Sequence, residues 1–194
     1  MSPNVNPFVL VALGANLPNG AIGPAETLRA ALAAMPDEGL VVERASRLFA
    51  TPCFPAGAGP DYVNAAACLR PVRGMEAQHV LAALHRIEAR HGRARVQRWG
   101  MRTLDLDLLA MGSVVLPDPE LAASWRDLPP ERQIAATPDR LILPHPRLQD
   151  RAFVLVPLAE VAPRWRHPAL GLTVAAMLRR LPAADIAAVK ALAP

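Results

Sequence analysis

The chain has 194 residues, 52% of them apolar, which is enough for one domain with a substantial core and too apolar for general disorder. The net charge is +4, and every basic residue except Lys190 is arginine, so the pI of about 10.0 says little about surface charge. Cys53 and Cys68 are too few for a disulfide framework, and the apolar run at residues 8–13 is too short to span a membrane and follows no basic residue. We therefore expect a cytoplasmic protein with reduced cysteines.

The N-terminal third predicts a strand, a helix and a second strand. Residues 8–13 form a continuous apolar run that ends at Gly14, as in a central strand. Residues 24–35 place apolar side chains at helical spacing, and Pro24 suits the first helical position. Residues 40–51 predict a strand with imperfect alternation. The loop at residues 51–60 contains three prolines and two glycines, which oppose both helix and strand.

The middle of the chain repeats this pattern. Residues 62–69 predict a strand, residues 75–91 an amphipathic helix that stops at Gly92, and residues 103–109 a further strand. Three histidines recur every six residues along the helix, a rotation of about 240° per step, so they share no face and predict no metal site. These histidines are His79, His85 and His91.

The order β-α-β-β-α-β predicts an α+β fold with a ferredoxin-like βαββαβ core. We expect a mainly antiparallel sheet with helices packed on it, extra C-terminal elements, and a single domain over residues 1–194. A proline-rich insertion at about residues 117–139 should lie outside the core with at most a short helix. The chain re-enters the core at residues 141–146, and an apolar run at 153–158 and an amphipathic piece at 172–181 follow.

A cluster of opposite charges occupies residues 93–109. Its arginines are Arg93, Arg95, Arg98 and Arg102. In a strand over residues 103–109, Asp105 and Asp107 share one face, and leucines occupy the other. Two carboxylates beside guanidinium groups suit a polyphosphate bridged by Mg²⁺. Ion pairing along an ordinary amphipathic strand is the alternative that the spacing alone leaves open.

Several short motifs then follow one another in order over about residues 8–163. They are Leu-Gly-Ala-Asn-Leu at 13–17, Thr-Pro at 51–52, Pro-Asp-Tyr-Val-Asn-Ala-Ala at 60–66, Arg-Ile-Glu at 86–88 with Gly-Arg-Ala-Arg at 92–95, Trp-Gly-Met-Arg-Thr-Leu-Asp-Leu-Asp at 99–107, and Pro-His-Pro at 144–146 with Arg-Ala-Phe-Val-Leu at 151–155. Together they resemble the 6-hydroxymethyl-7,8-dihydropterin pyrophosphokinases of folate biosynthesis.

This resemblance implies transfer of pyrophosphate from ATP to the hydroxymethyl oxygen of the reduced pterin, with release of AMP. It implies two Mg²⁺ ions on Asp105 and Asp107, and catalytic roles for these residues and for Arg93 and Arg95. Positioning and charge stabilisation would then carry catalysis, without a covalent enzyme intermediate.

The resemblance also implies two sets of substrate contacts. Contacts with ATP are expected from His85, Glu88, Arg95, Trp99, Arg102, Leu108, Arg140, His145 and Arg151. Contacts with the pterin are expected from Thr51, Pro52, Phe54, Tyr62, Asn64, Trp99 and Phe153. Phe153 and Tyr62 would sandwich the ring, and Asn64 would read its edge.

Some positions depart from the family pattern. His85 stands where many relatives carry glutamine, Met101 replaces a usual proline, and the Arg95 to Trp99 interval is one residue shorter. The link between Asp107 and His145 is long, and we expect it to be an idle surface insertion.

Two other functions stay open from the sequence: a nucleic-acid-binding module, for which the arginine cluster would serve, and a family member that binds pterin without catalysis. We expect a monomer that binds small molecules and neither nucleic acid nor membrane.

Overall fold

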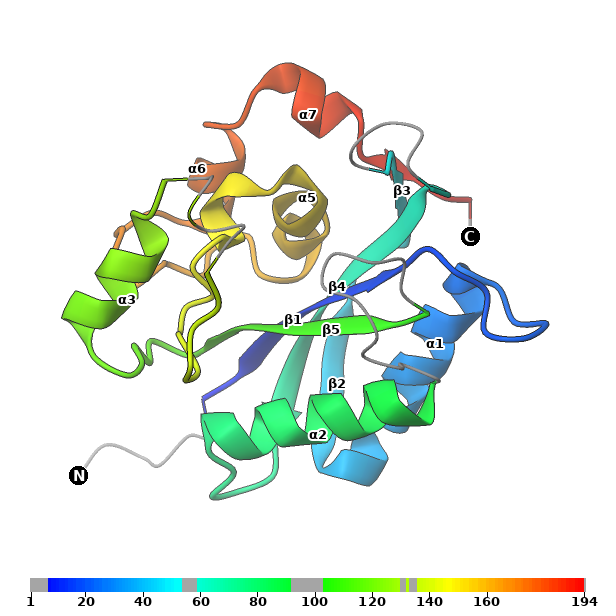
Figure 1. The fold of residues 1–194 in the computed structure, drawn as a ribbon, viewed down its shortest axis with the longest axis horizontal. Coiled ribbons are helices and arrows are strands. Elements are labelled where there is room, and N and C mark those ends of the chain that lie inside the picture. The colour runs from blue at the N-terminus through cyan, green and yellow to red at the C-terminus, as the bar shows by residue number, and fades with distance from the viewer. Residues whose placement is uncertain (1–6, 54–58, 92–102, 130–131, 133–135, 194) are drawn as a thin grey trace.

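The computed structural model describes residues 7–53, 59–91, 103–129, 132 and 136–193. A six-stranded antiparallel sheet forms its middle layer, with helices on both faces (Figure 1). The strands are β1 Val9–Ala15, β2 Leu40–Ala45, β3 Phe49–Thr51, β4 Tyr62–Pro71, β5 Asp105–Met111 and β6 Lys190–Ala191. The helices are α1 Pro24–Ala34, α2 Ala77–Arg90, α3 Pro119–Arg126, α5 Ala152–Val161, α6 Val174–Leu178 and α7 Ala183–Ala187, with 3-10 turns at Pro36–Glu38 and Leu148–Asp150.

The sheet order is β5-β1-β4-β3-β6, and β2 pairs with the other half of β4. All these pairs are antiparallel, so the predicted α+β fold is confirmed. The two halves of the chain interleave in this order, because β4 and β5 flank β1. Elements distant in sequence therefore meet around β1.

One predicted element is wrong in extent. The single strand expected at residues 40–51 is two strands, β2 and β3, with a break between them. At the break Ser46 exchanges hydrogen bonds with Ala66, because Ser46 N donates to the Ala66 carbonyl and Ser46 Oγ accepts from Ala66 N, each at 2.9 Å. Arg47 then turns away from the sheet and donates to the carboxylate of Glu160 on α5. These long-range contacts explain the imperfect alternation.

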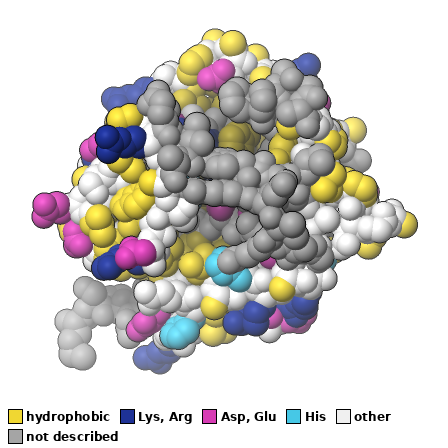
Figure 2. Space-filling view, in the orientation of Figure 1, with side chains coloured by type: hydrophobic (Ala, Val, Ile, Leu, Met, Phe, Trp, Pro, Cys, Tyr) yellow, Lys and Arg dark blue, Asp and Glu magenta, His cyan; other side chains and the backbone are white. Residues whose placement is uncertain are grey.

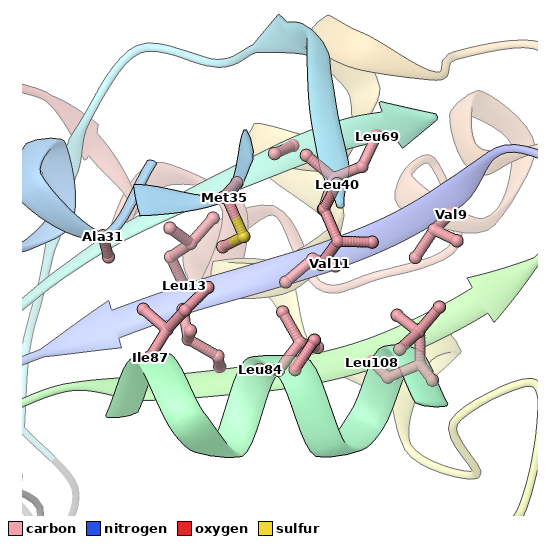
Figure 3. Packing of buried hydrophobic residues seen from close by; sticks show 14 of the residues in the cluster. Val9, Val11, Leu13, Ala31, Met35, Leu40, Leu69, Leu84, Ile87 and Leu108 are labelled. Carbon is pink, nitrogen blue, oxygen red and sulfur yellow. The ribbon is translucent and has the colours of Figure 1, made fainter. Parts of the chain in front are cut away.

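Two apolar clusters hold the layers together. On one face Leu28 of α1 and Leu84 and Ile87 of α2 pack against β1, β4 and β5 (Figure 3). On the other face α5 and α6 pack against the same strands through residues such as Leu155 and Val174. A helix buries one face here because its apolar side chains recur at three- and four-residue spacing. Among the described residues, no helix combines the length and hydropathy that crossing a bilayer requires.

The insertion has structure of its own. Its helix α3 begins after Asp118, whose carboxylate caps the helix by accepting from Leu121 N at 2.8 Å. At its base Leu116 and Leu143 exchange backbone hydrogen bonds, which closes the excursion. The described part of the insertion therefore contains a short helix, which the sequence analysis allowed for.

Candidate active site

Strand β5 presents two different faces. Leu104, Leu106 and Leu108 are at most 4% exposed and belong to the cluster under α2, where Figure 3 shows Leu108 beside that helix. Asp105 and Asp107 alternate with them and are half-buried. The predicted segregation of leucines from aspartates is confirmed. The carboxylates therefore lie on the face of the sheet that α5 covers.

A row of paired residues crosses the sheet from Asp105. Asp105 pairs with Gly14 on β1, and Gly14 pairs with Asn64 on β4. Directly paired residues of antiparallel strands share a face, and neighbouring strands lie about 4.8 Å apart, so Asp105 and Asn64 stand roughly 10 Å apart on one face. We call these three residues the Gly14 row. Gly14 has no side chain, so β1 places none between the two polar residues.

Asn64 is held firmly at its end of the row. Its Nδ2 donates to Thr51 Oγ1 at 2.6 Å, and both residues are only 6% exposed. Its Oδ1 lies beside Gly14, because a Cβ added to Gly14 would stand 3.0 Å from that oxygen. Tyr62 pairs with Thr51 on the same face. An amide and a hydroxyl fixed in this way can form hydrogen bonds with the edge of a polar ring.

The start of α5 brings an aromatic ring and a cation to the same place. Phe153, in the first turn of α5, is 40% exposed, and the Arg151 guanidinium carbon lies 5.6 Å from its ring centroid. Burial lowers the pKa of Arg151, while the charges of Asp107 and Asp105 act in the opposite direction. The guanidinium therefore lies within electrostatic reach of both carboxylates and against the exposed ring.

His145 completes the polar face as a neutral side chain. Its backbone N donates to the Leu109 carbonyl of β5 at 2.8 Å, which ties the Pro-His-Pro segment to that strand. Its Nδ1 accepts from Arg147 N at 3.1 Å, so the neutral ring carries its proton on Nε2. Burial and the nearby Arg151 charge lower the pKa of His145 to about 3. The ring is thus a hydrogen-bond donor without a charge at neutral pH.

Of the residues expected to contact ATP, Glu88 and Leu108 lie on the α2 side of β5, and Arg140 lies at the surface. Glu88 is 1% exposed, and its Oε1 accepts from the backbone N of Leu106 at 2.8 Å. Leu108 lies in the core under α2, so only its backbone could reach a nucleotide. Arg140 is exposed, pairs with Asp139 at 3.2 Å, and lines a cavity of about 380 Å³. The expected contacts of these three residues with ATP stay predictions.

The remaining predicted residues divide into two groups. His85 is half-buried on α2, and Pro52 is exposed beside Thr51. The predictions for Phe54, Arg93, Arg95, Trp99 and Arg102 lie outside the described residues.

Two arginines on α2 precede the charged segment at residues 93–109. Arg86 and Arg90 on α2 each reach the Glu38 carboxylate at 2.7 Å, so neither points to the aspartates. In Figure 2 the described basic and acidic side chains are interspersed around the visible face. These two guanidinium groups are therefore paired within the protein.

The carboxylate pair fits Mg²⁺. The residues that the structure describes contain no group of three or more histidine, cysteine or carboxylate side chains able to hold a metal ion between them. Mg²⁺ does not need such a group, because one or two carboxylates with waters and substrate phosphates satisfy it. Asp105 and Asp107 offer hard oxygen ligands of this kind on one partly open face.

Sequence reasoning missed Gly14 as a site residue. The sequence shows a glycine at the end of the first apolar run. Only the pairing of β1 with both β4 and β5 shows that this glycine lies between Asn64 and Asp105. The approach of Arg151 to both carboxylates depends equally on tertiary structure.

Comparison with known proteins points to one family. Residues 10–163 match the family model for 7,8-dihydro-6-hydroxymethylpterin-pyrophosphokinase. A 2-amino-4-hydroxy-6-hydroxymethyldihydropteridine pyrophosphokinase of Synechocystis sp. is 36% identical over 95% of this chain and 80% of its own length. One of the same name from Pseudomonas aeruginosa is 39% identical over 82% of this chain and 83% of its own.

A solved structure supports the fold. The Plasmodium falciparum HPPK-DHPS A437G chain with SDX-DHP has a TM-score of 0.62 and 13% identity over 92% of this chain. The present chain spans 46% of that chain, so the likeness concerns one part of a longer protein. The family match and the two relatives carry the assignment. The chain belongs to the 7,8-dihydro-6-hydroxymethylpterin-pyrophosphokinase family.

Proposed function

We propose that this protein transfers the pyrophosphoryl group of ATP to the hydroxymethyl oxygen of 6-hydroxymethyl-7,8-dihydropterin, giving AMP and the pterin diphosphate, with Mg²⁺ as cofactor. The observation that carries the proposal is the Gly14 row, in which Asp105 and Asn64 face the same side of the sheet from the two strands that flank Gly14. Roughly 10 Å separates them, which is room for a flat ring and a phosphate group side by side.

The pterin is assigned to the Asn64 end of the row. A pterin has a guanidine-like edge that needs matched polar groups, and Asn64 Oδ1 and Thr51 Oγ1 are fixed there by their mutual hydrogen bond. Its faces need apolar contact, and Phe153 exposes 40% of its surface close by Arg151. An aromatic ring so exposed at a polar site is suited to stacking on a substrate.

The triphosphate is assigned to the Asp105 end. Asp105 and Asp107 would hold Mg²⁺, which when bound neutralises charge on the phosphates and orients them. Arg151 adds a fixed positive charge beside both carboxylates. His145 can donate from Nε2 to a phosphate oxygen, and because its pKa is about 3 it does so without a charge that competes with the cation.

Catalysis then rests on orientation. The row holds the hydroxymethyl oxygen and the phosphate in a fixed relation, since Asp105 and Asn64 belong to strands that are both hydrogen-bonded to β1. Holding two reactants in reacting geometry can remove several kcal/mol from a barrier, about 7 to 11 in the best cases. The chain needs no nucleophile of its own for this transfer.

The test is the identity of the nucleotide product. The protein is incubated with MgATP and the reduced hydroxymethylpterin, and nucleotides are separated by anion-exchange chromatography. We expect AMP in amounts equal to the pterin diphosphate, and none when pterin or Mg²⁺ is omitted. Release of ADP, or turnover that does not depend on pterin, would defeat the proposal.

The same assay separates the two alternative functions. A pterin-binding protein without catalysis would bind the pterin and release no AMP. A nucleic-acid-binding module would bind RNA without Mg²⁺ or ATP, and its affinity would fall steeply with salt. The control is the double variant Asp105→Asn, Asp107→Asn, which should fold and release no AMP above background.

A further inference from the structure

Glu88 makes an unusual contact for a residue in the last turn of a helix. It faces inward from α2, is 1% exposed, and accepts from the backbone N of Leu106 at 2.8 Å. Leu106 is the residue between Asp105 and Asp107 on β5. The peptide that joins the two carboxylate-bearing residues is therefore held from the helix behind it.

The Leu106 N–H needs this acceptor. In the described sheet β5 is an outer strand, hydrogen-bonded to β1 alone. Along an antiparallel edge, successive N–H groups alternate between the partner strand and the outside, so the group that reaches Glu88 is one that β1 does not bind. Leu106 is 2% exposed, and water does not replace the bond. A buried N–H without a partner costs about 1 to 3 kcal/mol.

The carboxylate occupies this place at a cost. Leu84 and Ile87, its neighbours on the buried face of α2, are fully buried and apolar. A negative charge near the C-terminus of a helix is also opposed by the helix dipole. An apolar residue would carry no charge there, but it could not accept from Leu106 N. The position therefore favours a specific hydrogen bond over general packing.

Strand β5, which carries the two carboxylates, is irregular, and a contact that holds its backbone would matter for the site. The register between β1 and β5 shifts just after Leu108, since Val11 pairs with Leu108 but Leu10 pairs with Ala110. Such an irregularity bends a strand and increases its local twist. A small rotation of the intervening peptide would alter how Asp105 and Asp107 converge, and sites of this kind tolerate only about 0.5 Å of displacement.

We propose that Glu88 is a positioning residue that fixes Leu106, and through it the relative orientation of Asp105 and Asp107, rather than a ligand of ATP. The inference rests on the proposed function for the reaction that the two aspartates serve. The bond itself is a property of the substrate-free protein, so it can be tested without turnover.

The first experiment measures hydrogen exchange of the Leu106 amide by NMR in the protein without substrates. Glu88→Met replaces the carboxylate by an apolar side chain of similar length and so removes the acceptor. Glu88→Gln keeps an acceptor oxygen. We expect Glu88→Met to speed exchange at Leu106 by more than its effect on other β5 amides. Glu88→Gln should retain the protection.

The matched control is Leu84→Ala, on the same buried face of α2. It should destabilise the protein without removing the acceptor, so exchange at Leu106 should rise only with that of its neighbours. Ile87→Val gives a milder version should Leu84→Ala fold poorly. This control separates loss of the bond from loss of stability.

The second experiment measures kcat and the KM for ATP in the same variants. We expect Glu88→Met to lower kcat by roughly 10- to 100-fold, the usual cost of removing a group that orients metal ligands, with the KM for ATP nearly unchanged. Glu88→Gln should lose far less.

Three results would overturn the proposal. They are protection at Leu106 that survives in Glu88→Met, a raised KM for ATP with unchanged kcat, and a Glu88→Gln variant whose Leu106 amide is as unprotected as that of Glu88→Met. If instead the wild type releases no AMP, the proposed function fails, while amide exchange still decides whether Glu88 holds Leu106.

Discussion

The seven residues of β5 alternate between two faces, one in an apolar environment and one among charged groups. On the α2 side Leu106 and Leu108 are excluded from water by apolar neighbours. On the α5 side Asp105 and Asp107 are half-buried near Arg151 and His145. Because side chains alternate along a strand, one segment carries stability on one face and charge on the other. Substitutions on the two faces should therefore separate these properties.

The largest expected effect is on the aspartate face. Asp107→Asn keeps the size of the side chain and removes its charge, so it should lower kcat by about 1,000-fold, or ~4 kcal/mol of transition-state stabilisation, while the unfolding midpoint changes little. Steady-state kinetics and thermal unfolding measured together check this. Turnover close to that of the wild type would remove the proposed metal role of Asp107.

The leucine face should give the converse result. Leu104 is fully buried, and Leu104→Ala should lower the free energy of unfolding by about 3 kcal/mol by leaving a cavity. Activity per folded molecule should stay near that of the wild type. Urea unfolding supplies the stability, and titration of active sites supplies the folded fraction. An intact stability with lost turnover would show that the two faces are not separable.

Two histidines, one in the candidate site and one outside it, should make the stability of the protein depend on pH. Burial lowers the pKa of His145 to about 3 and of His167 to about 4, whereas an unfolded histidine titrates near 6.5. Between these values the unfolded chain binds more protons, so stability should fall as the pH drops below about 6.5, by up to ~1.4 kcal/mol per pH unit for each histidine. Urea unfolding from pH 7.5 to 4.5 measures this slope.

The two histidines then serve as each other's control. His167→Asn keeps an acceptor for the backbone N atoms of Ala169 and Leu170, so it should flatten the slope without changing activity. His145→Asn should flatten the slope and also lower kcat. An unchanged slope in both variants would mean that neither ring is held neutral by the fold.

The smallest expected effect comes from a substitution at Gly14, between the proposed positions of the two substrates. Gly14→Ala places a Cβ 3.0 Å from Asn64 Oδ1, so the amide must shift by a few tenths of an ångström. The Kd for the pterin should rise about tenfold, close to 1.4 kcal/mol, while binding of MgATP without pterin stays the same. Calorimetric titration of each substrate checks this. Equal losses for both substrates would contradict a pterin site at the Asn64 end.

The sequence predicted β5 well because its signal is local. The period of two assigns Asp105 and Asp107 to one face without reference to a neighbouring strand. The helical spacing of residues 75–91 likewise predicts an amphipathic helix, and in the structure Glu88 lies on its buried face. The resemblance assigned Glu88 to ATP, but its contact with Leu106 depends on how α2 docks against β5.

Features that depend on distant contacts were not predictable in the same way. The break between β2 and β3 requires Ala66 and Glu160, which are remote in sequence. The two-residue strand β6 has no periodicity of its own and exists because it pairs with β3. The Gly14 row likewise arises only when three strands are brought side by side.

The central claim is that pyrophosphate passes from ATP to the pterin hydroxyl across the Gly14 row, and an isotope experiment tests it most directly. Pterin carrying ¹⁸O in its hydroxymethyl group is mixed with MgATP and the protein, and the products are examined by ³¹P NMR, with Asp107→Asn as the blank. We predict an ¹⁸O shift on the phosphorus attached to the pterin and unlabelled AMP, because the hydroxymethyl oxygen attacks the β-phosphorus of ATP. Pterin diphosphate without the label next to phosphorus, or label in AMP, would contradict the account.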